Sequence, residues 1–563
     1  MNQGCWKVDE NDEGIIHSPK KVVLDFSDFI KIILRYSIVF PNKLTYRIVT
    51  FAGPTNTFYK RDKNHQFSNE LWTELYKSKK TGSKAIYIDI DDTKTDDSNQ
   101  EYSRWNELPD LILEEIFSYL SIREKYYASL VCRSWYRAFH LPQAWAQFVL
   151  EDNTLTRGRF NYYSGWQYVL DHVRTQMCLS AVGKNFRKLT FEPMLNFFNL
   201  YEFMNMVSWY SENSDKKAEN IQKGIGGKIN TLKFTFPCNM TTRDDTERIR
   251  LFGTGGKLLA ALKRLMNNLK NLRRLELIDL MLDPKEAQYL LDEVCQNCYE
   301  NLKYLCVINT TRVQYTLLHI GVFINLQVLI VSPQNLGDDN IELLCYTNLK
   351  HLHILQNRYT PNDVNIKPVS PQSWKKCRQI NRVLRVHLQL ESMKEKPLIW
   401  QKGAPVKTVL YNSPHIGANI NQLVMSIELY KNTLQIYGHL NVPRFWSPKS
   451  FFNRIDSSLI LLLRECPYIS TLIVTERIST ATVLLLAFTG QNLRYLHIRG
   501  NAVIIRNDWP KNNEWSEEFY SWLKVNCKSY KLVEQEVSQI LGYQWHFLTD
   551  KEFKNLNINL HVP

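Results

Sequence analysis

The sequence lacks a hydrophobic run long enough to cross a membrane as a helix. Its most apolar stretch, Ser457 to Phe488, contains four charged residues, whereas a membrane span needs ~20 uninterrupted apolar residues. The first residues also lack the basic and then apolar leader of a secreted protein. We therefore expect a chain that stays inside the cell, in the cytoplasm, the nucleus or both.

Disulfide, zinc and catalytic motifs are missing as well. The 11 cysteines are an odd number without the spacing of a disulfide framework. Cys295-Gln-Asn-Cys298 has the spacing of half a zinc site, but no second Cys or His pair follows at a suitable distance, so buried structural cysteines are the favoured interpretation. No His-Glu-x-x-His run, nucleophile elbow or kinase motif set occurs. We predict no metal site, no cofactor and no catalytic centre.

The composition is that of a folded, basic protein. Hydrophobic residues make up 44% of the 563 residues, which is enough to bury more than one core. Lys and Arg outnumber Asp and Glu by 70 to 56, an excess that favours acidic partners without requiring nucleic acid. Residues 1 to 104 contain no motif and end in the acidic run Asp89 to Glu101, which we interpret as a linker. Their fold stays open.

A six-residue phrase recurs after about residue 180, with apolar side chains at its first, fourth and sixth positions. Its eleven copies begin at residues 186, 229, 272, 302, 326, 349, 383, 406, 434, 469 and 493, the copy at 434 being degraded. The shortest spacings, 23 and 24 residues, are typical of leucine-rich repeats, in which each repeat supplies one strand and a return segment. The longer interval at Ser211 to Lys228 is predicted to be a loop.

Ordinary strands of an α/β sheet are the alternative explanation of this phrase, because the phrase alone is common. Eleven copies, with helical segments such as Pro284 to Val294 between them, favour the repeat interpretation. We therefore predict an α/β fold with an open, horseshoe-like solenoid at residues 180–500. The aromatic-rich residues 501–563 are predicted to form a helical cap that closes the array.

Residues 105–150 carry a different pattern, with apolar residues at helical spacing. Its elements are Trp105-x-x-Leu108-Pro109, Ile116-Phe-Ser-Tyr-Leu120, Val131-Cys-Arg-x-Trp135 and Trp145. In order and spacing, this pattern resembles the F-box family. A generic amphipathic helical hairpin is the alternative, and it leaves the agreement of all four elements unexplained. The sequence departs from the family at Tyr126-Tyr127, where smaller aliphatic residues are more usual.

The resemblance implies a small helical module that docks on a Skp-type adaptor, which joins a cullin and a RING subunit. The chain would then be the non-catalytic substrate-recognition subunit of an SCF-type ubiquitin ligase, with the repeats binding the protein to be degraded. A non-degradative scaffold and a nucleic-acid-binding repeat protein are the alternatives. Phe117, Val131 and Trp135 would hold the module together. Carried over by position, the adaptor-binding residues are Leu108, Pro109, Ile112, Ile116, Tyr119 and Leu120.

The repeat phrase also predicts an open strand face. Its third and fifth residues should leave the strand opposite the buried leucines, and its second residue should sit at the strand edge. Because these positions are rich in Arg, Lys and His, an acidic or phosphorylated protein segment is the expected ligand, and a merely solvated basic face is the alternative. The predicted substrate-binding residues are Arg274, Tyr304, His351, His353, Arg385, His387, Tyr495 and His497.

Overall fold

The structure is a computed structural model, and it divides into two compact units, Met1–Phe139 and His140–Pro563, which are taken separately below. The predicted N-terminal extension, its acidic linker and Trp105 lie outside the residues that the structure describes. Those residues are 107–162, 165–194, 196–215, 224–236, 256–361, 366–392, 396–442, 450–558 and 560.

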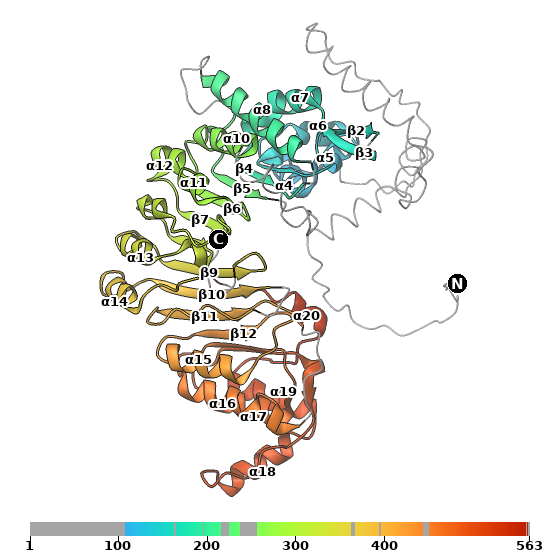
Figure 1. The fold of residues 1–563 in the computed structure, drawn as a ribbon. Helices are drawn as coiled ribbons and strands as arrows, with labels where there is room; N and C mark the ends of the chain where they lie inside the picture. Colours follow the sequence, from blue (N-terminus) through green and yellow to red (C-terminus); the bar gives the residue numbers. More distant parts are fainter. Residues whose placement is uncertain are drawn as a thin grey trace, which may run out of the picture. The chain divides into compact units, whose positions relative to one another are not determined.

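The first unit contains helices α4 (Asp110–Tyr119), α5 (Ile122–Ser129) and α6 (Arg133–Phe139) (Figure 1). A capping box begins α5, because the Ser121 hydroxyl accepts from the Glu124 amide at 3.3 Å and the Glu124 carboxylate accepts from the Ser121 amide at 2.9 Å. In the core, the rings of Phe117 and Trp135 meet edge to face, 6.0 Å apart.

The second unit is built on one parallel sheet, whose twelve described strands follow one another in chain order. The strands are β1 (Gln147–Leu150), β4 (Lys188–Phe191), β5 (Thr231–Thr235), β6 (Arg274–Ile278), β7 (Tyr304–Ile308), β8 (Val328–Val331), β9 (His351–Asn357), β10 (Arg385–Glu391), β11 (Val406–Tyr411), β12 (Ile436–His439), β13 (Thr471–Val474) and β15 (Tyr495–Ile498). A hairpin of β2 (Thr156–Asn161) and β3 (Gly165–Leu170), and a short pair of β14 (Ile478–Ser479) and β16 (Val503–Ile504), stand outside this sheet.

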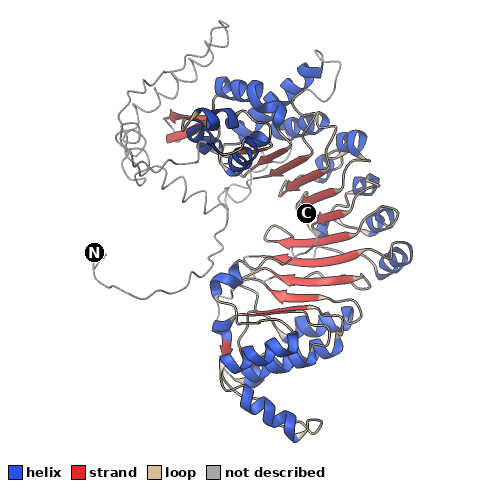
Figure 2. Ribbon diagram, turned by 180° about the vertical axis from the view of Figure 1, so that it is seen from behind, coloured by secondary structure: helices blue, strands red, loops and turns tan. Residues whose placement is uncertain are grey.

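Helices return the chain from one strand to the next, and Figures 1 and 2 show most of them along one face of the sheet. They are α7 (His172–Val182), α8 (Phe197–Asp215), α10 (Gly256–Asn267), α11 (Pro284–Ala287), α12 (Asp292–Cys298), α13 (Asp338–Leu344), α14 (Pro371–Ile380), α15 (Ile420–Tyr430), α16 (Asp456–Glu465) and α17 (Thr480–Thr489), followed by α18 (Glu517–Asn526), α19 (Tyr530–Leu541) and α20 (Asp550–Lys554). Short 3-10 turns lie at Gln143–Trp145, Gly183–Asn185, Leu318–Val322, Pro333–Asn335, Phe451–Asn453 and Gly500–Ala502.

In-register leucines form the core between the sheet and these helices. Leu275, Leu305, Leu329 and Leu352 pair across β6 to β9, and each is 0% exposed. No single strand could bury such a row alone, so each repeat depends on its neighbours. Every one of the eleven sequence phrases coincides with a strand of the sheet. The predicted α/β fold, a helical module followed by a repeat solenoid, is therefore confirmed.

Two predicted boundaries need correction. The sheet begins at β1, which pairs in parallel with β4 and lies before residue 180, within the range assigned to the helical module. Residues 145–150 carry the repeat phrase, with Trp145, Phe148 and Leu150 at its first, fourth and sixth positions, and this copy was overlooked because Trp145 was assigned to the helical module. The predicted loop at Ser211 to Lys228 starts instead with the last turn of α8, and residues 216–223 lie outside the described part.

A buried polar network joins the strands at the edge where they end. The Asn309 amide donates to Asp279 at 2.7 Å and to Asn357 at 2.6 Å, and the Asn309 backbone amide donates to the Ser332 hydroxyl at 2.9 Å. Burial raises the pKa of Asp279, while the hydrogen bonds from Asn309 and Asn357 act in the opposite direction. The network links β6, β7, β8 and β9 across four repeats.

The last strands are covered by C-terminal helices. Helix α19 packs on α17, and the Trp545 indole Nε1 donates to the Leu496 carbonyl of β15 at 2.6 Å. Among the described helices, none combines the length and hydrophobicity that crossing a bilayer requires.

His439 makes the stability of the solenoid depend on pH. Its ring stacks on Tyr411 with centroids 4.6 Å apart, and burial lowers its pKa from 6.5 to about 4. The unfolded chain takes up this proton near pH 6.5 and the folded chain only near pH 4. Stability therefore falls by up to roughly 3 kcal/mol as the pH drops through that window.

We expect His439→Phe to remove most of this loss, measured by urea unfolding at about pH 7.5 and about pH 5. His172→Phe, at an exposed position of α7, is the control and should keep the wild-type dependence. An unchanged pH dependence in His439→Phe would contradict the assignment.

Candidate functional site

The helical module exposes several large apolar side chains. Ile112 and Tyr119 are 47% and 57% exposed and lie seven residues apart on one face of α4, next to Leu111 at 79%. The opposite face of α4 supplies the buried Leu113 and Phe117. Further exposed apolar side chains of the module are Tyr127, Leu130, Val131 and Tyr136. Such a concentration of exposed apolar side chains is typical of a protein-binding surface.

The predicted adaptor-binding residues divide into two groups in the structure. Pro109, Ile112 and Tyr119 are exposed and Leu108 is half-buried. Ile116 and Leu120, in contrast, are 8% and 7% exposed and belong to the core of the module. Their contact with an adaptor stays a prediction, and little of their side chains is left for it, because Leu113, Ile116, Phe117 and Leu120 follow the three- and four-residue spacing of one inward helix face.

Val131 requires the opposite correction. The sequence placed it among the residues that hold the module together, but it is 59% exposed, as is Leu130 at 49%. Both lie between α5 and α6, where the chain turns and neither residue belongs to a helix face. Sequence reasoning also missed Leu111, whose exposure could have been inferred because it lies two residues, or about 200° around the helix, from the inward Leu113.

Tyr119 adds a polar group, its phenol hydroxyl, to this surface. A hydrogen bond to Glu115 raises the pKa of the Tyr119 phenol, so the hydroxyl keeps its proton at neutral pH. The surface of α4 can thus offer a neutral hydroxyl beside aliphatic side chains. This suits docking against another apolar surface, since tyrosine combines an apolar ring with a hydrogen-bonding end.

The predicted strand face is more closed than the sequence indicated. Tyr304, His353 and His387 are buried, at 5%, 0% and 2% exposure. Arg274, His351 and His497 are half-buried, and only Arg385 and Tyr495 are exposed. The expectation of an open face is therefore wrong for the three buried residues. Neighbouring strands are ~4.8 Å apart, so in-register side chains on this face shield one another.

A histidine stack illustrates this closure. His353 and His387 are in-register partners of β9 and β10, and their rings stack with centroids 4.4 Å apart. A ring nitrogen of His351 lies 3.1 Å from one of His387, whose other nitrogen lies 2.9 Å from the Thr408 hydroxyl. These imidazoles hold each other in place between strands instead of facing an incoming ligand.

The Arg274 guanidinium already contacts two neighbouring side chains. Its guanidinium lies 3.9 Å from the centroid of the Tyr304 ring and donates to the Glu276 carboxylate at 2.6 Å. The ion pair offsets the charge that a ligand would need, and the ring covers one side of the guanidinium. Arg274 therefore stabilises the sheet surface, and its predicted role in capturing an acidic substrate is not favoured by these contacts.

The C-terminal segment covers another part of the strand face. Phe553 of α20 is 1% exposed and packs with Leu410 of β11 and Ile473 of β13, on the face opposite the leucine core. The Leu548 amide donates to the Ile498 carbonyl at 2.9 Å, and Arg499 pairs with Asp550 at 2.7 Å. Partly buried Leu548, Leu556, Ile558 and Leu560 join the same cluster. The spacing of these apolar residues was the signal that sequence reasoning overlooked.

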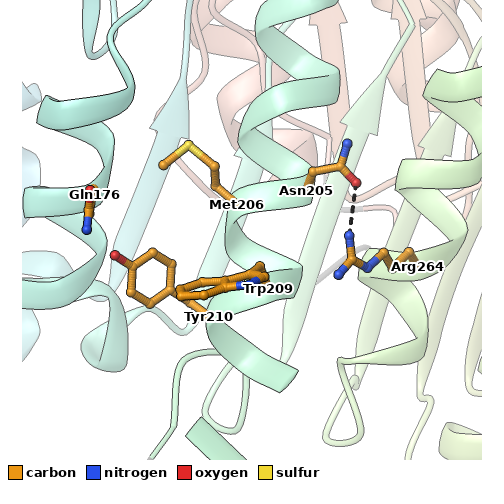
Figure 3. Close-up of a pocket in the computed structure, with 6 residues that line it drawn as sticks. All are labelled: Gln176, Asn205, Met206, Trp209, Tyr210 and Arg264. Carbon is orange, nitrogen blue, oxygen red and sulfur yellow. Dashed lines mark hydrogen bonds between the residues drawn. The ribbon is translucent and has the colours of Figure 1, made fainter. Parts of the chain in front are cut away.

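A hollow of about 400 Å³ lies among helices α7, α8 and α10, on the helical side of the unit (Figure 3). Trp209 and Met206 give it an apolar wall. Arg264 at its border is held by Glu212 at 2.6 Å and donates to Asn205 at 3.4 Å, so its charge is already balanced. Gln176 and Tyr210 complete the lining. The hollow offers no arrangement for catalysis.

The paired cysteines are poorly suited to metal or redox chemistry. Burial raises the pKa of the Cys295 thiol to about 12, and the Cys298 thiol donates to the Leu269 carbonyl at 3.1 Å. Metal binding and thiol exchange both need the thiolate, which such a pKa disfavours. In the part of the chain that the structure describes, no group of three or more His, Cys, Asp or Glu could hold a metal ion.

Comparison with known proteins adds the following. Residues 105–151 match the F-box-like family model. F-box/LRR-repeat protein 21 of Bos taurus is 39% identical over 57 residues, which are 10% of this chain and 13% of that protein. The Mus musculus protein of that name is 41% identical over 49 residues, 9% of this chain and 11% of its own. The chain thus spans only a small part of these curated relatives.

A solved chain in the complex of Rad7 and Elc1 in yeast aligns over 82% of this chain and 98% of its own length. The alignment has 9% identity and a TM-score of 0.30, which is too low to carry an argument.

We predict that Phe553→Ala loosens the C-terminal segment from the strand face. Removing a fully buried phenylalanine ring costs roughly 3 kcal/mol, through lost burial and the cavity left behind. Amide hydrogen exchange of α20 should therefore accelerate by about 100-fold. Phe452→Ala, at a side chain 90% exposed, is the matched control and should leave exchange unchanged. Equal protection of α20 in both variants would contradict the packing described.

Proposed function

Because residues 105–151 are an F-box-like domain, we propose that this chain is the substrate-recognition subunit of a Skp-cullin-F-box ubiquitin ligase. The helical module binds a Skp-type adaptor, and through it the cullin and RING subunits. The solenoid binds the protein to be ubiquitinated. The chain supplies no transfer chemistry, so ubiquitin moves on the partner subunits.

The exposed face of α4 is the observation that carries the proposal. Leu111, Ile112 and Tyr119 leave a large apolar area in water although other residues of the same helix are fully buried. The module therefore does not lack the means to bury its apolar residues, and those left outside fit a groove in a partner. An amphipathic helix that lays its apolar face on another protein needs few directed hydrogen bonds.

The division of the chain supports separate tasks for its two units. The helical module has its own core around Phe117 and Trp135, and the solenoid has its own leucine core. Adaptor binding and substrate binding can thus be carried by surfaces that fold independently. The described cysteines are all free thiols, which suits the reducing cytoplasm or nucleus that we propose as its location.

The test is Ile112→Asp in the full-length chain, with binding to a purified Skp-type adaptor measured by calorimetry. A carboxylate in the centre of an apolar contact must be desolvated without a partner, so we expect affinity to fall at least tenfold. Ile420→Asp is the matched control, because Ile420 is 50% exposed against 47% for Ile112 and lies in the first turn of α15.

The control should bind the adaptor like the wild-type chain, and both variants should show the same thermal unfolding of the solenoid. Adaptor binding by folded Ile112→Asp that equals wild type would overturn the docking proposal. Binding that is retained without any adaptor-dependent ubiquitination of captured proteins would instead favour the non-degradative scaffold.

A further inference from the structure

Basic side chains line the edge of the sheet at which the strands begin. The amide of Arg273 donates to the Asn230 carbonyl at 2.8 Å, that of Lys303 to Arg273 at 2.9 Å, and that of Gln327 to Lys303 at 2.8 Å. Backbone hydrogen bonds of this kind continue along the edge and fix its spacing. The basic rim is defined as Arg187, Lys188, Arg273, Lys303, Lys350, Arg385 and Lys407.

The rim charges are exposed and uncompensated. Six of the seven side chains are exposed and Lys407 is half-buried, and none of the seven forms an ion pair with a described residue. Basic residues further along β5 and β6 differ, since Lys233 pairs with Glu192 at 3.8 Å and Arg274 with Glu276 at 2.6 Å. The rim thus keeps the positive charge that the strand face has neutralised.

Positive charges lie near one another at one end of the rim. Burial lowers the pKa of Lys407, and the neighbouring charges of Arg385 and Arg378 lower it further. Cations gathered without counter-charges favour binding of an anion, because an anion relieves their repulsion as well as making its own contacts.

The two ends of the described strands differ in charge, because acidic residues occur only at the end where the strands finish. Acidic residues lie where strands end, such as Glu192 after β4 and Glu391 at the end of β10. At the positions where described strands begin, the other members of the row are neutral, such as Asn230, Gln327 and Gln435, or basic, as Arg494 is before β15, and none is acidic. A randomly solvated basic surface would mix the two signs, whereas this sheet has a positive edge.

We propose that the basic rim binds an extended polypeptide segment of about ten residues that carries carboxylate or phosphate side chains. From β4 to β11 there are seven strand-to-strand steps of ~4.8 Å, or about 34 Å, and an extended chain covers ~3.3–3.6 Å per residue. Arg and Lys in such a row give charge-assisted hydrogen bonds to either kind of anion.

A polypeptide fits the rim better than single-stranded nucleic acid does. Sequence-tolerant binding of a nucleic acid strand uses aromatic platforms between the basic residues. Among the described positions of the rim there is no aromatic residue, and the nearest in-register tyrosine, Tyr304, is buried under Arg274. The bound segment would belong to the substrate, so its biological meaning rests on the proposed function, although the binding itself does not need the adaptor.

The test uses full-length protein without adaptor and fluorescence anisotropy of labelled peptides. The probes are deca-glutamate, a ten-residue peptide of alternating phosphoserine and glycine, and a deca-glutamine control. The test variant is Arg273→Glu, Lys303→Glu and Lys350→Glu combined. The matched control is Lys285→Glu, Lys375→Glu and Lys531→Glu, three exposed positions on helices that change net charge by the same amount.

We expect at least one of the two anionic peptides to bind, with affinity that falls as salt is added, and deca-glutamine not to bind. The rim variant should lose at least tenfold in affinity, while the helix variant stays within about twofold of wild type. The anionic peptide that binds more tightly identifies carboxylate or phosphate as the preferred group.

Equal binding of the peptides by the rim variant and the helix variant would overturn the proposal, because net charge alone would then explain it. A labelled ten-nucleotide DNA strand that binds more tightly than both peptides and is lost in the rim variant would also overturn it, in favour of nucleic acid. Adaptor affinity of the rim variant should equal that of wild type, so failure of the rim is distinguishable from failure of the adaptor-docking proposal.

Discussion

The stacking of parallel strands is the constraint on which the rest of the solenoid depends. Each strand contributes leucines that are buried only because the next strand places its own leucines in register, as from Leu275 to Leu352. The same spacing acts on every other row of the sheet. It brings His353 against His387 on the strand face and sets the intervals between Arg273, Lys303 and Lys350 along the rim.

Polar residues have different roles at the two edges of the sheet. Where strands end, the buried Asn309 and Asp279 and the half-buried Asn357 satisfy one another, so their hydrogen bonds stabilise the stack. Where strands begin, the charges of the basic rim stay in solvent. A solenoid can thus reserve one edge for cohesion and leave the other for recognition, since backbone hydrogen bonding holds both edges.

The repeat phrase was sufficient to locate strands but not to determine exposure. Leucines at its first, fourth and sixth positions report burial against helices, and this part of the fold follows from period alone. The exposure of the third and fifth positions depends on which segment of the chain packs against the strand face. Nothing near Leu410 in the sequence indicates that Phe553, far along the chain, would pack there. Likewise, the closure around His353 arises from the neighbouring strand, not from its own repeat.

In the helical module, too, the sequence located the helices but did not determine the exposure of every residue. Its motif located the helices, and Ile112 and Tyr119 are exposed as a docking surface requires. Ile116 and Val131 were exchanged between core and surface, because family position alone does not say which side of a short helix or turn meets water. That distinction depends on how α4, α5 and α6 pack, which a motif does not encode.

The C-terminal segment on β11 to β13 has a consequence for the order in which the protein matures. Leu410 and Ile473 are synthesised long before Phe553 emerges from the ribosome, so this strand face stays bare of its own cover while the later repeats are still being made. Nascent chains with such a bare apolar face are a target for chaperones. This strand face can therefore be closed only after all twelve described strands of the sheet have been made.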